Sequence, residues 1–242
     1  MEFVRGLSGR WVEIAAAVYL IGMMLYGHHR GFIRLCVSAA ALLITIVSVR
    51  FAAPHVTDWL KNDTPLFGAI RQGIEKTVGL EEGAWVPTGP SAERLFIEEL
   101  DLPEQMKRLL LENNNGEIYE RLGVRVFRDY VTDYLADMIL RILVFVGLFA
   151  VVYLILHVAT VWLDLIVRLP ILSGLNQIAG AVLGFVQALI FLWILCLVFT
   201  AFSGTGFGKT VLAGIEASGW LSWIYDHNML SLLVFGFLKT VL

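Results

Sequence analysis

The chain has 242 residues, of which 58% are hydrophobic and 16% are charged, and its formal net charge is -3. Soluble domains have about 45–50% apolar and about 25% charged residues. A globule of 27.0 kDa cannot bury this apolar excess, so lipid must cover part of it. The small net charge also argues against nucleic acid as a partner. Composition therefore excludes an ordinary soluble enzyme and predicts an all-α integral membrane protein whose first partner is the lipid bilayer.

Four apolar stretches are close to the roughly 17–25 residues that a helix needs to cross a bilayer. They are residues 11–26, 32–51, 139–162 and 178–202. The first is short, but no small-residue cleavage site separates it from the second, so we interpret it as a span and not as a signal peptide. Short links at 27–31 and 164–177 predict that the spans form two antiparallel hairpins.

Between the hairpins lies an acidic insert, residues 54–137, which holds sixteen of the twenty-one Asp and Glu but only nine Lys and Arg. Thr64-Pro65 predicts a helix start, and Asp101 and Glu104 have the spacing of a capping box. Apolar or aromatic residues recur every four positions from Ile118 to Tyr134, which predicts a helix that continues into the third span. The insert is therefore expected to be helical and exposed to water, between hairpins at 1–53 and 138–202.

The tail, residues 203–242, is expected to be amphipathic or re-entrant. Its last fourteen residues, 229–242, are apolar apart from Lys239, which is too short for a fifth span and suits an interfacial or re-entrant helix. Residues 203–210 resemble a phosphate-binding loop, but Ser203 stands where that motif needs Gly, and an apolar span precedes the segment in place of a strand. We interpret this segment as a turn at the end of the fourth span.

A few ionisable groups in or near the spans are candidates for a polar role within the membrane. Glu13 lies close to the start of the first span and His157 lies within the third. The interpretations that require no specific function are a headgroup contact for Glu13 and hydrogen-bonded packing for His157. His28 and His29 could bind metal or lipid phosphate, but an ordinary polar loop is the preferred interpretation. The sequence predicts no catalytic residues, metal ligands or cofactors.

The fourth span carries a stripe of small or polar residues, Asn176, Gly180, Gly184 and Ala188, at four-residue spacing. Small residues on one face allow another helix backbone to approach closely, and Asn176 or Gln187 could hydrogen-bond across the contact. The stripe is consistent either with packing inside one chain or with a homo-oligomer or partner interface.

Two motifs now carry a resemblance to a known family. Arg30-Gly31-Phe32-Ile33-Arg34 is similar to an R-G-F-x-R turn before the second span, and Leu172-Ser173-Gly174-Leu175-Asn176 followed by Gly180 and Gly184 is similar to an L-x-x-x-N/D…G-x-x-x-G segment at the fourth. In this order, with four spans and an aromatic-rich tail, they resemble the colicin V production protein (CvpA) family over roughly residues 8–53 and 139–225.

The resemblance implies a multi-pass protein of the bacterial inner membrane, needed for production or secretion of a colicin V-type toxin and linked to envelope homeostasis. It favours a cytoplasmic turn at Arg30, Gly31, Phe32 and Arg34, with the insert and both termini outside, whereas counting Lys and Arg near the spans leaves the orientation open. An accessory or scaffold protein with secretion or envelope partners is the leading expectation. A small transporter or channel subunit is the alternative.

Overall fold

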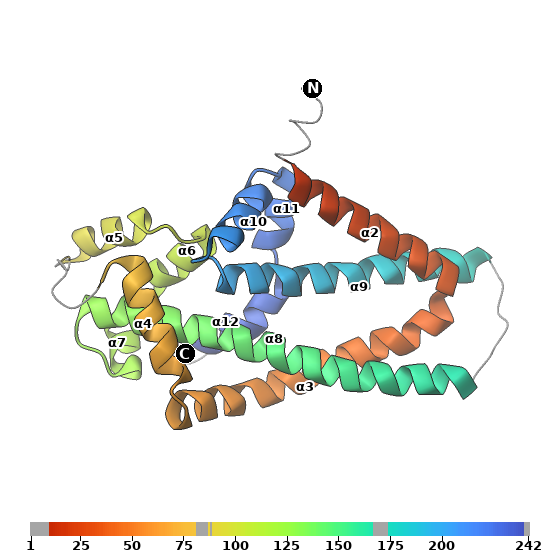
Figure 1. The fold of residues 1–242 in the computed structure, drawn as a ribbon, viewed down its shortest axis with the longest axis horizontal. Coiled ribbons are helices and arrows are strands. Elements are labelled where there is room, and N and C mark those ends of the chain that lie inside the picture. Colours follow the sequence, from red (N-terminus) through yellow and green to blue (C-terminus); the bar gives the residue numbers. More distant parts are fainter. Residues whose placement is uncertain (1–9, 81–86, 88, 167–173, 240–242) are drawn as a thin grey trace. The chain divides into compact units, whose positions relative to one another are not determined.

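A computed structural model describes residues 10–80, 87, 89–166 and 174–239, and every regular element in these ranges is an α-helix (Figure 1). The helices are α2 (Trp11–Arg30), α3 (Phe32–Asp63), α4 (Leu66–Val78), α5 (Pro90–Glu99), α6 (Glu104–Asn113), α7 (Gly116–Leu122), α8 (Phe127–Ile166), α9 (Gly174–Ala201), α10 (Gly206–Glu216), α11 (Gly219–Asp226) and α12 (Met229–Lys239). The predicted all-α class is confirmed.

Four of these helices are long and apolar enough to cross a membrane: α2, α3, α8 as far as Ala159, and α9. They correspond to the four predicted spans. Helix α8 has 40 residues, and at 1.5 Å per residue it is about 60 Å long, twice the roughly 30 Å of a bilayer's hydrocarbon core. Part of α8 must therefore extend beyond the hydrocarbon core, and its N-terminal part, which carries Asp129, Asp133 and Asp137, is the part least suited to lipid.

The links between spans differ from the predicted ones. Helix α2 continues through His28, His29 and Arg30, so the first link is the single residue Gly31 and not a five-residue loop. Helix α9 already begins at Gly174, which places Asn176 inside its first turn, although we expected the second link to continue to residue 177. The rest of the second link, residues 167–173, lies outside the described residues.

The chain forms two compact units. The first unit comprises Met1–Pro54, Phe145–Val198 and Ala213–Leu242; the second comprises His55–Val144 and Phe199–Leu212. In the first unit, Leu42 and Val49 are almost fully buried, whereas Val18 and Leu25 on α2 are 63% and 60% exposed. An exposed apolar face of this size would be unfavourable in water and suits contact with lipid.

In the second unit the short helices pack on the N-terminal part of α8, where Tyr130 and Tyr134 are fully buried. The Tyr130 hydroxyl donates to the carbonyl oxygen of Leu110 at 2.6 Å, and Asn113 Nδ2 donates to the Tyr134 hydroxyl at 3.0 Å. The predicted helical insert is therefore present. The helix expected to run from Ile118 into the third span is interrupted, because Gly123 has a φ of 70° and ends α7.

The tail is three helices, and part of it packs in the first unit. Trp193 of α9 donates from Nε1 to the carbonyl oxygen of Ile224 at 3.1 Å and accepts at its own carbonyl from Asn228 Nδ2 at 2.9 Å. Tyr225 is 6% exposed and is a core residue, whereas Trp223 is 61% exposed. Helix α12 lies within the apolar run 229–242 and buries Val234 against the unit.

Candidate functional site

Helices α2 and α9 cross at glycine residues of both helices. A methyl group added to Gly180 would meet the carbonyl oxygen of Gly27 and lie 2.9 Å from the α-carbon of Gly31, and one added to Gly184 would lie 3.1 Å from the α-carbon of Gly27. Only a hydrogen atom fits on each helix at this crossing. The next residue of the stripe, Ala188, is fully buried. The small stripe of α9 thus faces α2 of the same chain.

Asn176 joins the same crossing to the start of α3. Its Oδ1 accepts a hydrogen bond from the backbone N–H of Ile33 at 3.2 Å, although 143 residues separate the two along the chain. This N–H belongs to the first turn of α3, where no intrahelical acceptor is available. Gly31 has a φ of 76°, and a side chain there would collide with the amide nitrogen of Asn176. Two separate reasons therefore require glycine at position 31.

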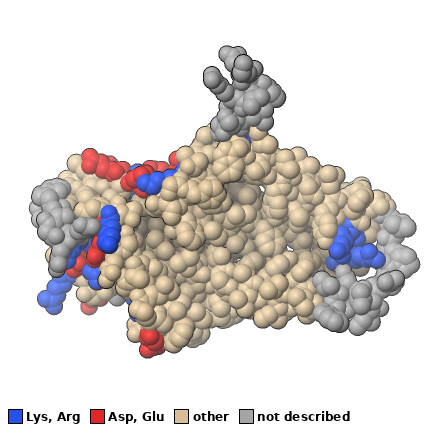
Figure 2. All heavy atoms as spheres, in the orientation of Figure 1, with Lys and Arg blue, Asp and Glu red and all other residues tan. Residues whose placement is uncertain are grey.

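The turn presents its charged side chains outward. Arg30, Phe32 and Arg34 are exposed, and the Arg30 guanidinium lies 5.4 Å from the centre of the Tyr26 ring. Figure 2 shows a group of Lys and Arg at the end of the first unit where α2 meets α3. The glycine crossing holds the backbone of this turn, so the two guanidinium groups extend from a fixed position. Such groups bind carboxylates or phosphates through paired hydrogen bonds.

Glu13 and His157, the two residues predicted to have a polar role within the membrane, lie apart from this turn. Glu13 accepts from Arg10 Nε at 2.7 Å and from Trp220 Nε1 at 3.0 Å, which ties the start of α2 to the tail. His157 is exposed and stacks on Tyr153 at 5.6 Å between ring centres. These contacts give each of them a packing role.

A buried ion-pair network in the second unit was missed from the sequence. Asp137 of α8 is 2% exposed and pairs with Lys61 at 3.1 Å and with Arg141 at 2.6 Å. One turn earlier, Asp133 lies 2.9 Å from Arg71, which also pairs with Asp129 at 3.1 Å. The readable signal was Asp129, Asp133 and Asp137 at four-residue spacing, which places three carboxylates on one face of a helix.

The segment that resembles a phosphate-binding loop is occupied by protein contacts. The Ser203 hydroxyl is buried and donates to the sulfur of Met106 at 3.7 Å, and Thr205 Oγ1 accepts from the N–H of Gly208 at 3.1 Å at the start of α10. Lys209 pairs with Asp101, and this hydrogen bond lowers the pKa of that carboxyl below its usual value. Asp101 therefore does not form the predicted capping box with Glu104, whose helix has no side-chain cap.

Residues 121–226 match the family model of the colicin V production protein. No curated protein and no solved structure matches the chain. The matched segment contains the second of the two motifs, Asn176 with Gly180 and Gly184, and runs from the end of α7 through α11. The match agrees with the resemblance carried by the second motif, whereas the first motif, Arg30 to Arg34, lies outside the matched residues.

Proposed function

We propose that this protein is an accessory or scaffold protein of the bacterial inner membrane that assists production or secretion of a colicin V-type toxin and maintains the envelope. The match over residues 121–226 supports a CvpA-like role. The observation that carries the scaffold role is the fixed arginine turn. Gly31 and Asn176 hold a one-residue link between two spans, and Arg30 and Arg34 are exposed on it.

A scaffold needs a rigid element with an exposed recognition surface. The glycine contacts leave α2 and α9 no room to move toward one another without a clash, which gives the turn a fixed backbone. Its two guanidinium groups suit the carboxylates of an acidic partner segment on the cytoplasmic side. Positive charge next to a span also retains a loop in the cytoplasm, so the orientation that we propose and the contact role use the same residues.

The test replaces Arg30 and Arg34 together by Gln in a strain that depends on this protein for toxin release. We expect released toxin, measured as growth inhibition of a sensitive strain, to fall at least about tenfold, as for loss of one charged hydrogen bond worth roughly 1.5–3 kcal/mol. Membrane level and orientation are measured in the same cells. A matched control replaces Arg94 and Arg125, two exposed arginines of the second unit, by Gln.

Three outcomes separate the interpretations. Lost release from a correctly inserted protein, with the control active, supports the contact role. Inverted or degraded protein would show that the arginines serve insertion alone. Full release would remove the turn from the proposed function.

A transporter or channel subunit is the second candidate, because one observation favours it. Gln187, midway along α9, is 6% exposed and its amide nitrogen lacks a hydrogen-bond partner among the described residues. Solute flux into proteoliposomes, compared between the wild type and Gln187→Met, distinguishes this candidate from the scaffold, which predicts no flux above empty vesicles.

A further inference from the structure

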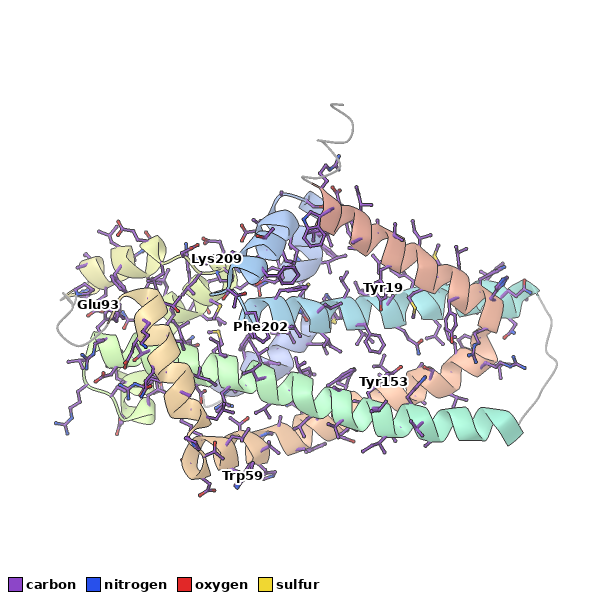
Figure 3. All side chains as sticks on the ribbon, in the orientation of Figure 1. Tyr19, Trp59, Glu93, Tyr153, Phe202 and Lys209 are labelled. Carbon is purple, nitrogen blue, oxygen red and sulfur yellow. The ribbon has the colours of Figure 1, made fainter. Side chains whose placement is uncertain are left out.

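Contacts of the tail attach it both to the start of α2 and to α9. Trp220 of α11 donates from Nε1 to the Glu13 carboxylate at 3.0 Å, so α11 lies beside the first turn of α2 (Figure 3). Near the end of α10, a methyl group added to Gly214 would lie 2.6 Å from a methyl carbon of Val12. On the other side, Trp193 of α9 donates from Nε1 to a carbonyl oxygen of α11 at 3.1 Å. Both spans therefore fix the depth of α11.

Helix lengths place α11 at the membrane boundary opposite the arginine turn. Exposed guanidinium groups are strongly disfavoured in the hydrocarbon core, so the turn at Gly31 lies at or beyond one boundary. Glu13 lies eighteen residues from Gly31 along α2, and Trp193 lies seventeen residues from Asn176 along α9, which gives about 25–27 Å along either helix. The hydrocarbon core is roughly 30 Å thick. Two independent helices therefore place α11 close to the far boundary.

The outward face of α11 combines aromatic and polar side chains. Trp220 and Trp223 are exposed, whereas Leu221 and Tyr225 on the opposite face are buried. His227 continues the exposed face and stacks on Trp223 with 4.4 Å between ring centres. Two exposed indoles would be unfavourable in water, and an exposed imidazole would be unfavourable in the hydrocarbon core. The headgroup layer offers both kinds of surroundings, and tryptophan is enriched there.

The start of α12 extends this face with aliphatic side chains. Met229 and Leu232 are 66% and 65% exposed, while Leu230 between them is buried. Asn228 holds the start of α12 in place, because its Oδ1 accepts from the N–H of Leu230 at 3.0 Å and its Nδ2 donates to the carbonyl oxygen of Trp193 at 2.9 Å. The first turn of α12 therefore lies at the depth of α11, with its aliphatic side chains outward.

We propose that the tail face, Trp220, Trp223, His227, Met229 and Leu232, binds the lipid headgroup layer of the leaflet opposite the arginine turn. The indole rings lie among the headgroups, and the aliphatic side chains reach the first methylene groups of the acyl chains. Residues 210–238 contain no Lys or Arg, so this binding does not require anionic lipid.

The tail face and the arginine turn together set the depth of the first unit in the bilayer. The turn holds one boundary by charge, and the tail face holds the other by aromatic rings. This inference is the same whichever side of the membrane is cytoplasmic. It can therefore fail without affecting the proposed function, and the proposed function can fail without affecting it.

Spin labelling of the full chain in lipid nanodiscs tests the tail face. Trp223→Cys carries the label, with Cys36 and Cys196 replaced by Ala. Collisions of the label with oxygen, which concentrates in the bilayer core, and with a water-soluble nickel complex give its depth. Matched labels at Glu117, exposed on the short helix α7, and at Val151, exposed on the third span, are the water and hydrocarbon references.

We expect the Trp223→Cys label to lie within about 10 Å of the lipid phosphates, as an interfacial helix does, and to be intermediate between the references for both reagents. The depth should be the same in neutral and in anionic lipid. A label as accessible to nickel as that at Glu117, or as deep as that at Val151, would overturn the proposal. Protection from both reagents would also overturn it, because a second copy or a partner protein would then cover the face.

A second labelled variant, Met229→Cys, gives an independent measurement on α12. Circular dichroism melting of each labelled protein, compared with the wild type, confirms that the label has not disrupted the fold. Both positions are exposed, so neither substitution removes a buried contact. The proposal is overturned if the folded variants place the two labels on different sides of the boundary, one in water and one in the core.

Discussion

Removing the Asp137 carboxylate is expected to destabilise the second unit strongly. In Asp137→Ala, the ammonium of Lys61 and the guanidinium of Arg141 lose a carboxylate that lies 3.1 Å and 2.6 Å away and is 2% exposed. Removing one partner of a buried ion pair costs about 3–5 kcal/mol, because the remaining charge is left uncompensated. The side chains of Lys61 and Arg141 are 32% and 17% exposed, so water partly solvates them and we expect about 3 kcal/mol.

The assay is thermal unfolding of the purified protein in detergent, followed by circular dichroism. A loss of about 3 kcal/mol corresponds to a decrease in Tm of about 6–12 °C for a chain of this size. Asp58→Ala, which removes an exposed carboxylate from α3, is the matched control and is expected to change stability by no more than about 0.5 kcal/mol. The reasoning is refuted if Asp137→Ala and Asp58→Ala melt within about 2 °C of each other.

The remaining predictions concern the glycine crossing, the insert and a half-buried tyrosine. Gly180→Leu or Gly184→Leu should lower the free energy of unfolding by more than about 3 kcal/mol and sharply lower the folded yield in detergent, because the leucine would separate backbones in contact. Phe185→Leu, at an exposed position, is the control. Equal yields of the three variants would contradict the close crossing. A cysteine at exposed Glu117, with the native cysteines replaced, should react in intact cells with a membrane-impermeant maleimide; labelling only after lysis would reverse the proposed orientation. Burial, with a smaller contribution from the charge of Glu93, raises the pKa of Tyr119 to about 12. The neutral phenol is favoured in the folded state, so this stabilisation is complete below about pH 10 and is lost as the pH rises towards 12. Tyr119→Phe should remove one tyrosinate transition near pH 12 from the ultraviolet titration. An unchanged titration would contradict the assignment of this transition to Tyr119.

The spans were predictable because a bilayer imposes its thickness on any apolar helix. The ends of these helices were not predictable, because apolar composition indicates which residues contact lipid but does not indicate where the backbone hydrogen bonds of a helix end. Helix α2 continues through His28, His29 and Arg30, whose backbones hydrogen-bond as well as those of apolar residues do, and it stops where Gly31 adopts positive φ. The break at Gly123 has the same cause, and the four-residue periodicity across it concealed the glycine.

The candidate site could be predicted in its parts but not in their contacts. The small stripe of α9 and the arginine turn were both visible as motifs, yet no property of either segment alone specifies the hydrogen bond between Ile33 and Asn176. The ion-pair network is different, since the spacing of Asp129, Asp133 and Asp137 was readable. It was overlooked because the predicted span began at residue 139, which assigned these carboxylates to the surface of the insert.

The contact between the two motifs explains why a resemblance based on both is more specific than either motif alone. A G-x-x-x-G pattern occurs in many membrane helices and only requires that some backbone lie close. Here that backbone is supplied by Gly27 and Gly31, and Gly31 is also fixed by its positive φ and by Asn176. Each motif therefore constrains the residue types allowed in the other, although only the second lies within the matched residues 121–226. The arginine turn lies outside that match but inside the same packed contact, which is the physical reason to regard it as part of the same site.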